Sequence, residues 1–165
     1  MTREDNETWR ELLNNLREQR RRIQTLIRLS REQTRVLAEA DVQRLAEITR
    51  EQAQNLDEID AIVHERRQLI RRLGENLALH VEPPTLTDCV RLAPDNVART
   101  LKWLQNELVR DIHHLQTLND RNRLLVNCAA ETVNTWLAVV VNAAANQMNY
   151  RSQPPGQAVV LDTEV

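Results

Sequence analysis

The stretch LLVNCAAETVNTWLAVVVNAAA, residues 124–145, decides how the rest of the chain is interpreted. It carries a single charge, Glu131, although 28% of the residues in the whole chain are charged. On an α-helix its polar residues fall on one narrow stripe, because residues three, four, seven or eight positions apart share a face. These polar residues are Asn127, Glu131, Asn134, Thr135 and Asn142. The rest of the circumference is apolar, so such a helix is either buried in a core or covered by a partner.

The face opposite this stripe is the candidate binding surface. It consists of Leu125, Ala129, Val133, Trp136, Val140 and Ala144. A buried core helix and a partner-binding helix both explain such a face. A membrane span explains it less well, because a span needs about 20 apolar residues. Here Asn, Glu and Thr side chains lie along the middle of the stretch, where lipid would disfavour them.

The composition predicts an all-α protein. The chain has 165 residues, enough for one domain with its own core, and contains 2 Gly, no Phe and 2% aromatic residues, which is typical of long helices with few turns. The formal net charge of -2 gives no overall attraction to nucleic acid or to an anionic membrane. The start MTREDNETWRELL lacks an apolar signal segment, so a cytosolic protein is expected. Cys89 and Cys128 are too few for a disulfide framework or a four-cysteine zinc site, and both are expected to be reduced packing residues.

Two heptad-patterned segments predict a helical hairpin. The first, at about residues 6–38, places Trp9, Leu16, Ile23, Ser30 and Leu37 on one heptad position, which is the pattern of a coiled coil. The second extends over about residues 42–73. The pattern shifts by one residue at residues 39–41, and Asp41 is a suitable N-cap, so a tight turn is expected there. One continuous helix is the alternative, because neither Gly nor Pro marks the turn.

The charges of the two segments support the hairpin. Seven arginines lie between Arg17 and Arg35, whereas residues 47–60 are acidic. In a hairpin that reverses near residue 40, residues whose numbers sum to about 80 lie side by side, which places residues 20–22 beside residues 57–60. The alternative is a nucleic-acid site, which needs unpaired basic residues, and no aromatic residue beside this run offers a stacking platform. We therefore expect no nucleic-acid partner.

The third helix is expected to be the longest. Gly74 is expected to end the second helix, Pro83 and Pro84 mark a loop, and a short helical turn is expected at residues 88–92. A third helix then begins at Pro94 or Asp95, and no helix breaker follows before Pro154. At 1.5 Å per residue the first two helices reach roughly 50 Å each and the third roughly 80 Å. An antiparallel three-helix bundle therefore runs out of partners near residue 128.

We expect one helical-bundle domain over residues 1–150, with its binding part at about residues 122–150, and a flexible tail over residues 151–165. The chain has no Gly-rich phosphate loop, no GxSxG and no HExxH. Asp111 with His114, and His113 beside them, is the best metal candidate, but a metal site in a helical bundle needs a second such pair. We therefore expect no catalytic residue, no cofactor, no metal and no enzymatic activity.

Three stretches also carry a likeness to a known family. They are Asp41 with Leu45 and Ile48; the run that contains Leu56, Ile59, Glu65 and Arg66; and Asn119, Asn122 and Leu125 leading to Tyr150, Gly156 and Val160-Leu161-Asp162. On these residues the chain resembles the FlgN family of flagellar type III export chaperones, over about residues 5–165.

The resemblance implies a cytosolic chaperone without stable membrane insertion. It implies that the protein keeps hook-associated proteins of the FlgK and FlgL type soluble before export, and that its C-terminal part holds the helical terminal segment of this client. It also implies docking on the flagellar export gate, for which Tyr150 is the candidate residue. The competing interpretation is a structural coiled-coil protein that forms a homodimer, weak or stable, through the same apolar seam.

Overall fold

The computed structural model describes the backbone of residues 3–77 and 84–151, and the side chains of residues 5–77 and 84–142. Over these ranges the chain forms α1 (Arg3–Glu39), α2 (Val42–Asn76), α3 (Leu86–Leu92) and α4 (Asp95–Arg151). The predicted all-α fold is confirmed, and so is the long third helix, which corresponds to α4 and is continuous over Asp95–Arg151. The tail predicted from residue 151 lies outside the described residues, apart from Arg151 at the end of α4.

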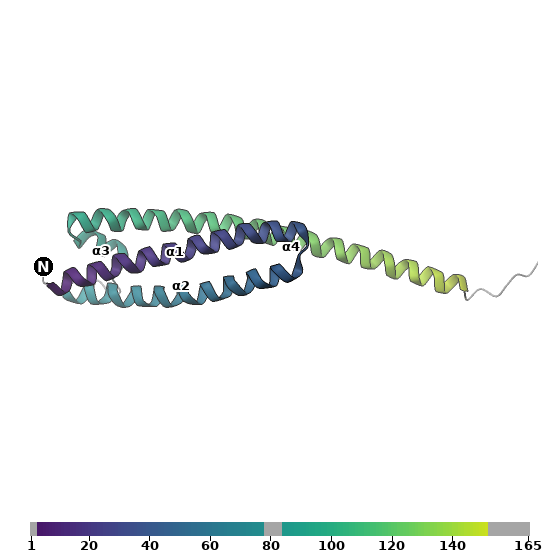
Figure 1. The fold of residues 1–165 in the computed structure, drawn as a ribbon, viewed down its shortest axis with the longest axis horizontal. Helices are drawn as coiled ribbons and strands as arrows, with labels where there is room; N and C mark the ends of the chain where they lie inside the picture. The colour runs from purple at the N-terminus through teal and green to yellow at the C-terminus, as the bar shows by residue number, and fades with distance from the viewer. Residues whose placement is uncertain (1–2, 78–83, 152–165) are drawn as a thin grey trace, which may run out of the picture. The chain divides into compact units, whose positions relative to one another are not determined.

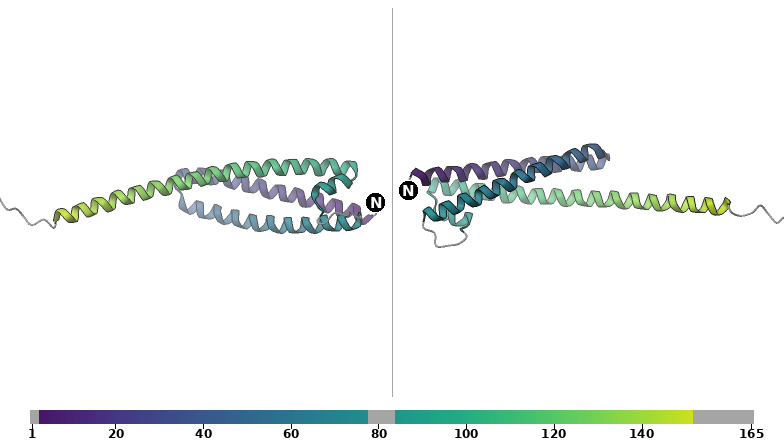
Figure 2. Two further views of the ribbon diagram at one scale, coloured as in Figure 1. Left: turned by 180° about the vertical axis from the view of Figure 1, so that it is seen from behind. Right: turned by 90° about the horizontal axis from the view of Figure 1, so that it is seen from below.

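The chain divides within α4 into two units, Met1–Leu125 and Val126–Val165. In the first unit α1 lies against both α2 and the first part of α4 (Figures 1 and 2). One core joins all four helices, and its buried members include Trp9, Leu12, Leu16, Ile23, Leu69, Leu73, Cys89, Leu101 and Leu104. The predicted heptad seam of α1 is therefore confirmed as the centre of the bundle. A smaller core of Leu29, Val36 and Ile48 joins α1 to α2 near their turn.

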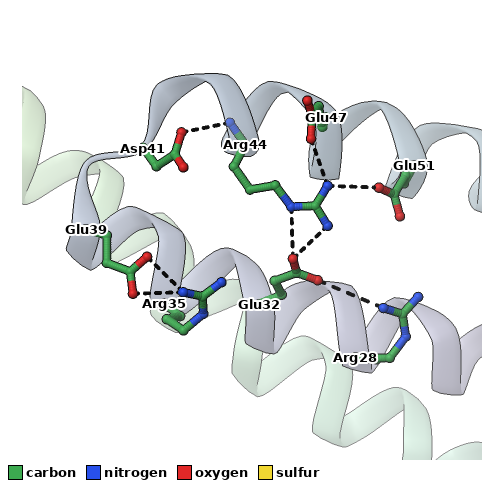
Figure 3. A network of polar contacts seen from close by, with 8 residues as sticks. All are labelled: Arg28, Glu32, Arg35, Glu39, Asp41, Arg44, Glu47 and Glu51. Atoms are coloured by element: carbon green, nitrogen blue, oxygen red, sulfur yellow. Dashed lines mark hydrogen bonds and ion pairs between the residues drawn. The ribbon is translucent and has the colours of Figure 1, made fainter.

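A tight turn joins α1 to α2, as predicted, and the continuous helix is excluded. Ala40 adopts a left-handed backbone with φ of 54°. The Asp41 carboxylate then caps α2 by accepting a hydrogen bond from the Arg44 amide at 3.0 Å. Figure 3 shows that the Arg44 guanidinium donates to Glu32 of α1 at 2.7 Å and to Glu47 of α2 at 2.9 Å. The bond from Arg44 lowers the pKa of Glu32 and ties the two helices together at the turn.

Gly74 does not end α2, so that prediction is wrong. The helix continues to Asn76, and the Leu77 amide still donates to the Leu73 carbonyl at 3.0 Å. Gly74 is buried. A glycine inside a helix costs about 1 kcal/mol relative to alanine, and burial at a position without a side chain allows close packing that offsets this cost.

The short helix α3 begins at Leu86, two residues before the predicted start. The reason is a capping box, because the Thr85 hydroxyl accepts from the Asp88 amide and the Asp88 carboxylate accepts from the Thr85 amide. These bonds to Thr85 lower the pKa of Asp88. Residues 78–83, where a loop was predicted, lie outside the described residues.

The charge pairing across the hairpin is partly confirmed. Arg22 of α1 forms an ion pair with Glu58 of α2. Their residue numbers sum to 80, as predicted for residues that lie side by side in this hairpin. Arg20 was predicted beside residues 57–60, and this is wrong. It pairs with Glu107 and Asp111 of α4, and its guanidinium lies 5.1 Å from the centre of the Trp103 ring. Residues two positions apart on a helix are rotated by about 200° around its axis, so Arg20 and Arg22 face different neighbouring helices.

A polar layer centred on the buried residues Ser30 and Asn122 ties α4 to the hairpin within the first unit. It consists of Ser30, Gln33 and Thr34 of α1, Gln52 of α2, and Asn119 and Asn122 of α4. The buried Asn122 amide donates to the Ser30 carbonyl at 2.9 Å and to Gln33 Oε1 at 3.0 Å, and its oxygen accepts from Thr34 at 2.6 Å. Because the polar groups satisfy one another only in this alignment, the layer sets the register of α4 against α1.

Candidate functional site

The candidate site is the part of α4 that we call the exposed segment, residues 126–142. Every side chain in it is exposed. Trp136, the largest of them, is 66% exposed, and Val133 and Val140 are exposed to a similar degree. Soluble proteins seldom leave so many adjacent large apolar side chains in water unless another molecule covers them. This segment is therefore the strongest candidate for a binding surface.

The structure places most of the predicted binding residues in this segment. Ala129, Val133, Trp136 and Val140 lie along one face of α4, and all four are exposed. Leu125 is partly buried and is the last residue of the first unit, so it does not belong to the exposed segment. Ala144 and Tyr150 are part of α4, which extends to Arg151, but their side chains lie outside the described residues.

A second apolar face, which the sequence reasoning missed, adjoins the first. Val126, Leu137 and Val141 are exposed on it, with Ala130 among them. The signal was present in the sequence, because residues 126, 130, 133, 137 and 141 are spaced by four, three, four and four positions, which places them on one face of a helix. The polar stripe indicates only the face opposite to it, so this adjoining face is not among the predicted binding residues.

The threonines of the segment contribute little polarity to its surface. The Thr132 hydroxyl donates to the Cys128 carbonyl at 2.9 Å, and the Thr135 hydroxyl donates to the Glu131 carbonyl at 2.9 Å. Both hydroxyls are thus satisfied by the helix itself. A shallow depression on this side is lined by these four residues and Trp136. Glu131 is the single charged residue in the exposed segment.

The two cysteines have different environments. Cys89 is free and fully buried, and burial raises the pKa of its thiol to about 11, as expected of a packing residue. Cys128 is also free, but it is exposed on α4. The predicted packing role is therefore confirmed for Cys89 and wrong for Cys128, because the Cys128 side chain is exposed.

The seven arginines from Arg17 to Arg35 of α1 all contact neighbouring side chains. Arg20, Arg21, Arg22, Arg28 and Arg35 pair with carboxylates, whereas Arg17 donates to Asn14 and Arg31 contacts His114. These contacts also change pKa values. At Glu18, the hydrogen bonds from Arg21 and Arg22 lower the pKa of the carboxyl from 4.5 to about 2.

The predicted metal candidate is part of the packing between α1 and α4. Asp111 accepts hydrogen bonds from Arg20 at 3.1 Å and Gln24 at 3.4 Å, and His114 lies 3.3 Å from the Arg31 guanidinium. Over residues 5–77 and 84–142, whose side chains the structure describes, there is no group of three or more side chains that could hold a metal ion.

By length and composition alone, α4 also qualifies as one candidate membrane span. The exposed segment, however, carries Asn127, Glu131 and Asn134, whose side chains are costly to place in lipid. It contains no Lys or Arg that would attract anionic headgroups to a helix lying on a membrane surface. A protein partner suits its mixture of apolar and neutral polar side chains better.

The fold and the exposed segment define a class of protein: an all-α bundle with an exposed apolar segment on its longest helix. Within this class, the family model described as FlgN protein matches residues 2–158. The chain belongs to the FlgN family, which confirms the resemblance seen in its residues, and members of this family are flagellar export chaperones. Comparisons with curated proteins and with solved structures find no match.

Proposed function

We propose that this protein is a cytoplasmic chaperone for hook-associated proteins of the FlgK and FlgL type. It binds the helical terminal segment of such a client on its exposed segment, keeps the client soluble and passes it to the flagellar export apparatus. The family membership supports the general role. The observation that supports this particular mode of binding is the exposure of every side chain at residues 126–142.

The size of the apolar surface is adequate for such binding. Val126, Val133, Trp136, Leu137, Val139, Val140 and Val141 are all substantially exposed. Burying one large apolar side chain removes on the order of 60 to 120 Å² from water and contributes about 1.5 to 3 kcal/mol. Seven such side chains approach the roughly 800 Å² that a stable interface takes from each partner.

A helix is the natural partner for this surface. The exposed segment is roughly 25 Å long, and an amphipathic helix can place its apolar residues along a helical groove or face of that length. The polar stripe that contains Asn127, Glu131 and Asn134 would then remain in water. An extended peptide fits less well, because a helix has no free backbone edge with which a strand could pair.

The second candidate is a homodimer formed through the same face. An apolar seam with heptad spacing suits a second copy of α4 as well as a client helix. The family role favours the client, because an export chaperone must have a surface free for its cargo. Sedimentation velocity of the purified chain at micromolar concentration distinguishes the two: a monomer supports client binding, whereas a stable dimer disrupted by Val133→Gln supports the structural alternative.

The test of the main proposal uses a hook-associated protein from the same cell. We expect that co-expression with the full chain raises the soluble fraction of this client and that the two proteins elute together in size-exclusion chromatography. A variant with Val133→Gln and Trp136→Gln should lose both effects while keeping its helical circular dichroism. Asn134→Gln, on the polar stripe between them, is the control and should behave as the parent. Equal binding by the parent and the double variant would refute the proposed site.

We further propose that Tyr150 and the tail from residue 151 contact the export gate rather than the client. The tail begins after the apolar stretch ends, and residues 152–155 read SQPP, a composition unsuited to continuing the helix. Truncation after Asn149 should therefore leave the client affinity within about tenfold of the parent while lowering export. If truncation abolishes client binding instead, Tyr150 and the tail hold the client, and the export-gate contact lies elsewhere in the chain.

A further inference from the structure

We propose that two helices from one client chain, packed side by side, cover the exposed segment. This inference rests on the proposed function and adds to it the architecture of the bound partner. The observation that carries it is the width of the apolar surface around α4. A single helix, whether it comes from a client or from a second copy, is too narrow to cover that surface.

The exposed segment has two apolar seams. Successive residues of a helix are rotated by about 100°, so the position of each side chain around the axis follows from its number. The first seam contains Ala129, Trp136 and Val140, and the second contains Val126, Leu137 and Val141. The centres of these seams are about 90° apart around the helix axis, and Val133 lies between them.

The apolar surface is also continuous from one seam to the other and beyond. Starting at Cys128 and Val139 and ending at Val141, it covers about 220° of the circumference. The polar residue inside this arc is Thr132, and its hydroxyl is already bonded to the Cys128 carbonyl. Thr132 therefore offers no polar group that must remain in water. The polar stripe that contains Glu131 and Asn134 is confined to the remaining part of the circumference.

One packed helix covers an arc of about 100°, the width of the apolar stripe on an ordinary amphipathic helix. If a helix occupied the first seam alone, Leu137 and Val141 would stay in water. The free structure shows no preference between the seams, since Val140 is 60% exposed and its neighbour Val141 is 58% exposed. Two helices on seams about 90° apart together cover about 190° of the circumference, so they remove most of the apolar surface from water, which one helix cannot do.

Both helices are assigned to one client chain. When the first helix has bound, a short connection holds the second helix at a high effective concentration beside its own seam, so the second step costs little additional entropy. A second copy of this protein brings one α4 and in a simple dimer leaves one seam exposed. The bound state is thus a three-helix arrangement of one α4 and two client helices.

The matched pair Val140→Gln and Val141→Gln tests this inference. The two positions are adjacent, have the same side chain and nearly the same exposure, and differ in the seam on which they lie. Glutamine is at least as favourable in a helix as valine, so the helix itself is retained. Asn142→Gln, the next residue and part of the polar stripe, is the control. Affinities of the full-length variants for the purified hook-associated protein are measured by titration calorimetry, which also gives the stoichiometry.

We expect each valine variant to weaken binding by roughly tenfold or more, Asn142→Gln to change it by less than about twofold, and one client to bind one chaperone. Weakening by only one of the two variants would overturn the two-helix arrangement and leave the proposed function standing. Two clients per chaperone would overturn the assignment to one chain. If neither variant weakens binding, the client site itself is wrong. If both variants instead dissociate an oligomer of the free chain, the occupant is further copies of this protein.

Hydrogen exchange of the client provides an independent readout. With the parent chaperone, two separate segments of the client should gain protection, each about as long as the exposed segment. With Val140→Gln one of them should lose protection first, and with Val141→Gln the other. Protection of one continuous segment, lost equally with both variants, would contradict the proposal.

Discussion

The substitution Trp136→Ala separates binding from stability most sharply. Trp136 is 66% exposed in the free protein, so about two thirds of its side chain remains to be buried by a partner. A tryptophan buries about 150 to 250 Å² when it is fully covered, which leaves on the order of 130 Å² for the interface. At about 25 cal/mol per Å² this corresponds to roughly 3 kcal/mol, of which an alanine in its place retains a small part. We therefore expect client affinity to fall by about 30-fold or more.

The stability of the free protein should hardly change. Alanine has a higher helix propensity than tryptophan by a few tenths of a kcal/mol, which offsets the small packing loss along the helix. The assay is titration calorimetry with the purified hook-associated protein, together with thermal unfolding of the free chain. Neighbouring Val133 and Val140 should each matter less than Trp136, because their side chains are smaller.

The chain provides two matched controls, because it contains 3 tryptophans in three environments. Trp103→Ala removes a side chain that is 52% exposed but lies in the first unit under the Arg20 guanidinium, so client binding should be unchanged. Trp9→Ala removes a side chain that is 2% exposed in the core, and it should destabilise the free protein by about 3 to 5 kcal/mol. If Trp136→Ala behaves like Trp9→Ala, the segment is buried core in solution. If it behaves like Trp103→Ala, the client site lies elsewhere.

Three further predictions concern the bundle. Ala40→Gly should raise the free energy of unfolding by about 0.5 to 1 kcal/mol in urea denaturation, because Ala40 has a positive φ that glycine adopts without strain. Asn122→Ala should lower the free energy of unfolding by roughly 2 to 4 kcal/mol, since it removes the bonds to the Ser30 carbonyl, Gln33 and Thr34 at a buried position, whereas Asp120→Ala on the exposed side of α4 should change it little. Glu18 has a pKa of about 2 in the folded protein against 4.5 ordinarily, so its contribution to stability is present above about pH 4.5 and is lost as the pH falls toward 2. Glu18→Gln should therefore reduce the fall in melting temperature between pH 5 and pH 2, and an unchanged slope would contradict the pairing of Glu18 with Arg21.

Local patterns in the sequence were sufficient to predict the helices. The heptad seam through Trp9, Leu16 and Ile23, the N-cap at Asp41 and the absence of helix breakers after residue 95 depend on neighbours within one or two turns. Helix lengths follow from such patterns, so the sequence also predicted that α4 outruns its partners. The FlgN family membership rests on similarly local stretches.

The tertiary structure decided which helix each side chain faces. Arg20 and Arg22 are close in sequence and equal in charge, yet one pairs with α4 and the other with α2, because the rotation between them directs them to different neighbours. Asn122 looks like an ordinary polar residue in the sequence, and only its contacts with Ser30, Gln33 and Thr34 make it part of a buried layer. Gly74 has the sequence signature of a helix end, but burial keeps it inside α2.

The same distinction applies to the candidate site. Sequence periodicity identified the face with Val133, Trp136 and Val140, because a polar stripe marks the opposite side. It did not show that Leu137 and Val141 are equally exposed, or that the Thr132 hydroxyl is turned back onto its own helix. Periodicity records which residues share a face of one helix. The surface left for a partner depends on what the other helices cover, and that is a property of the assembled fold.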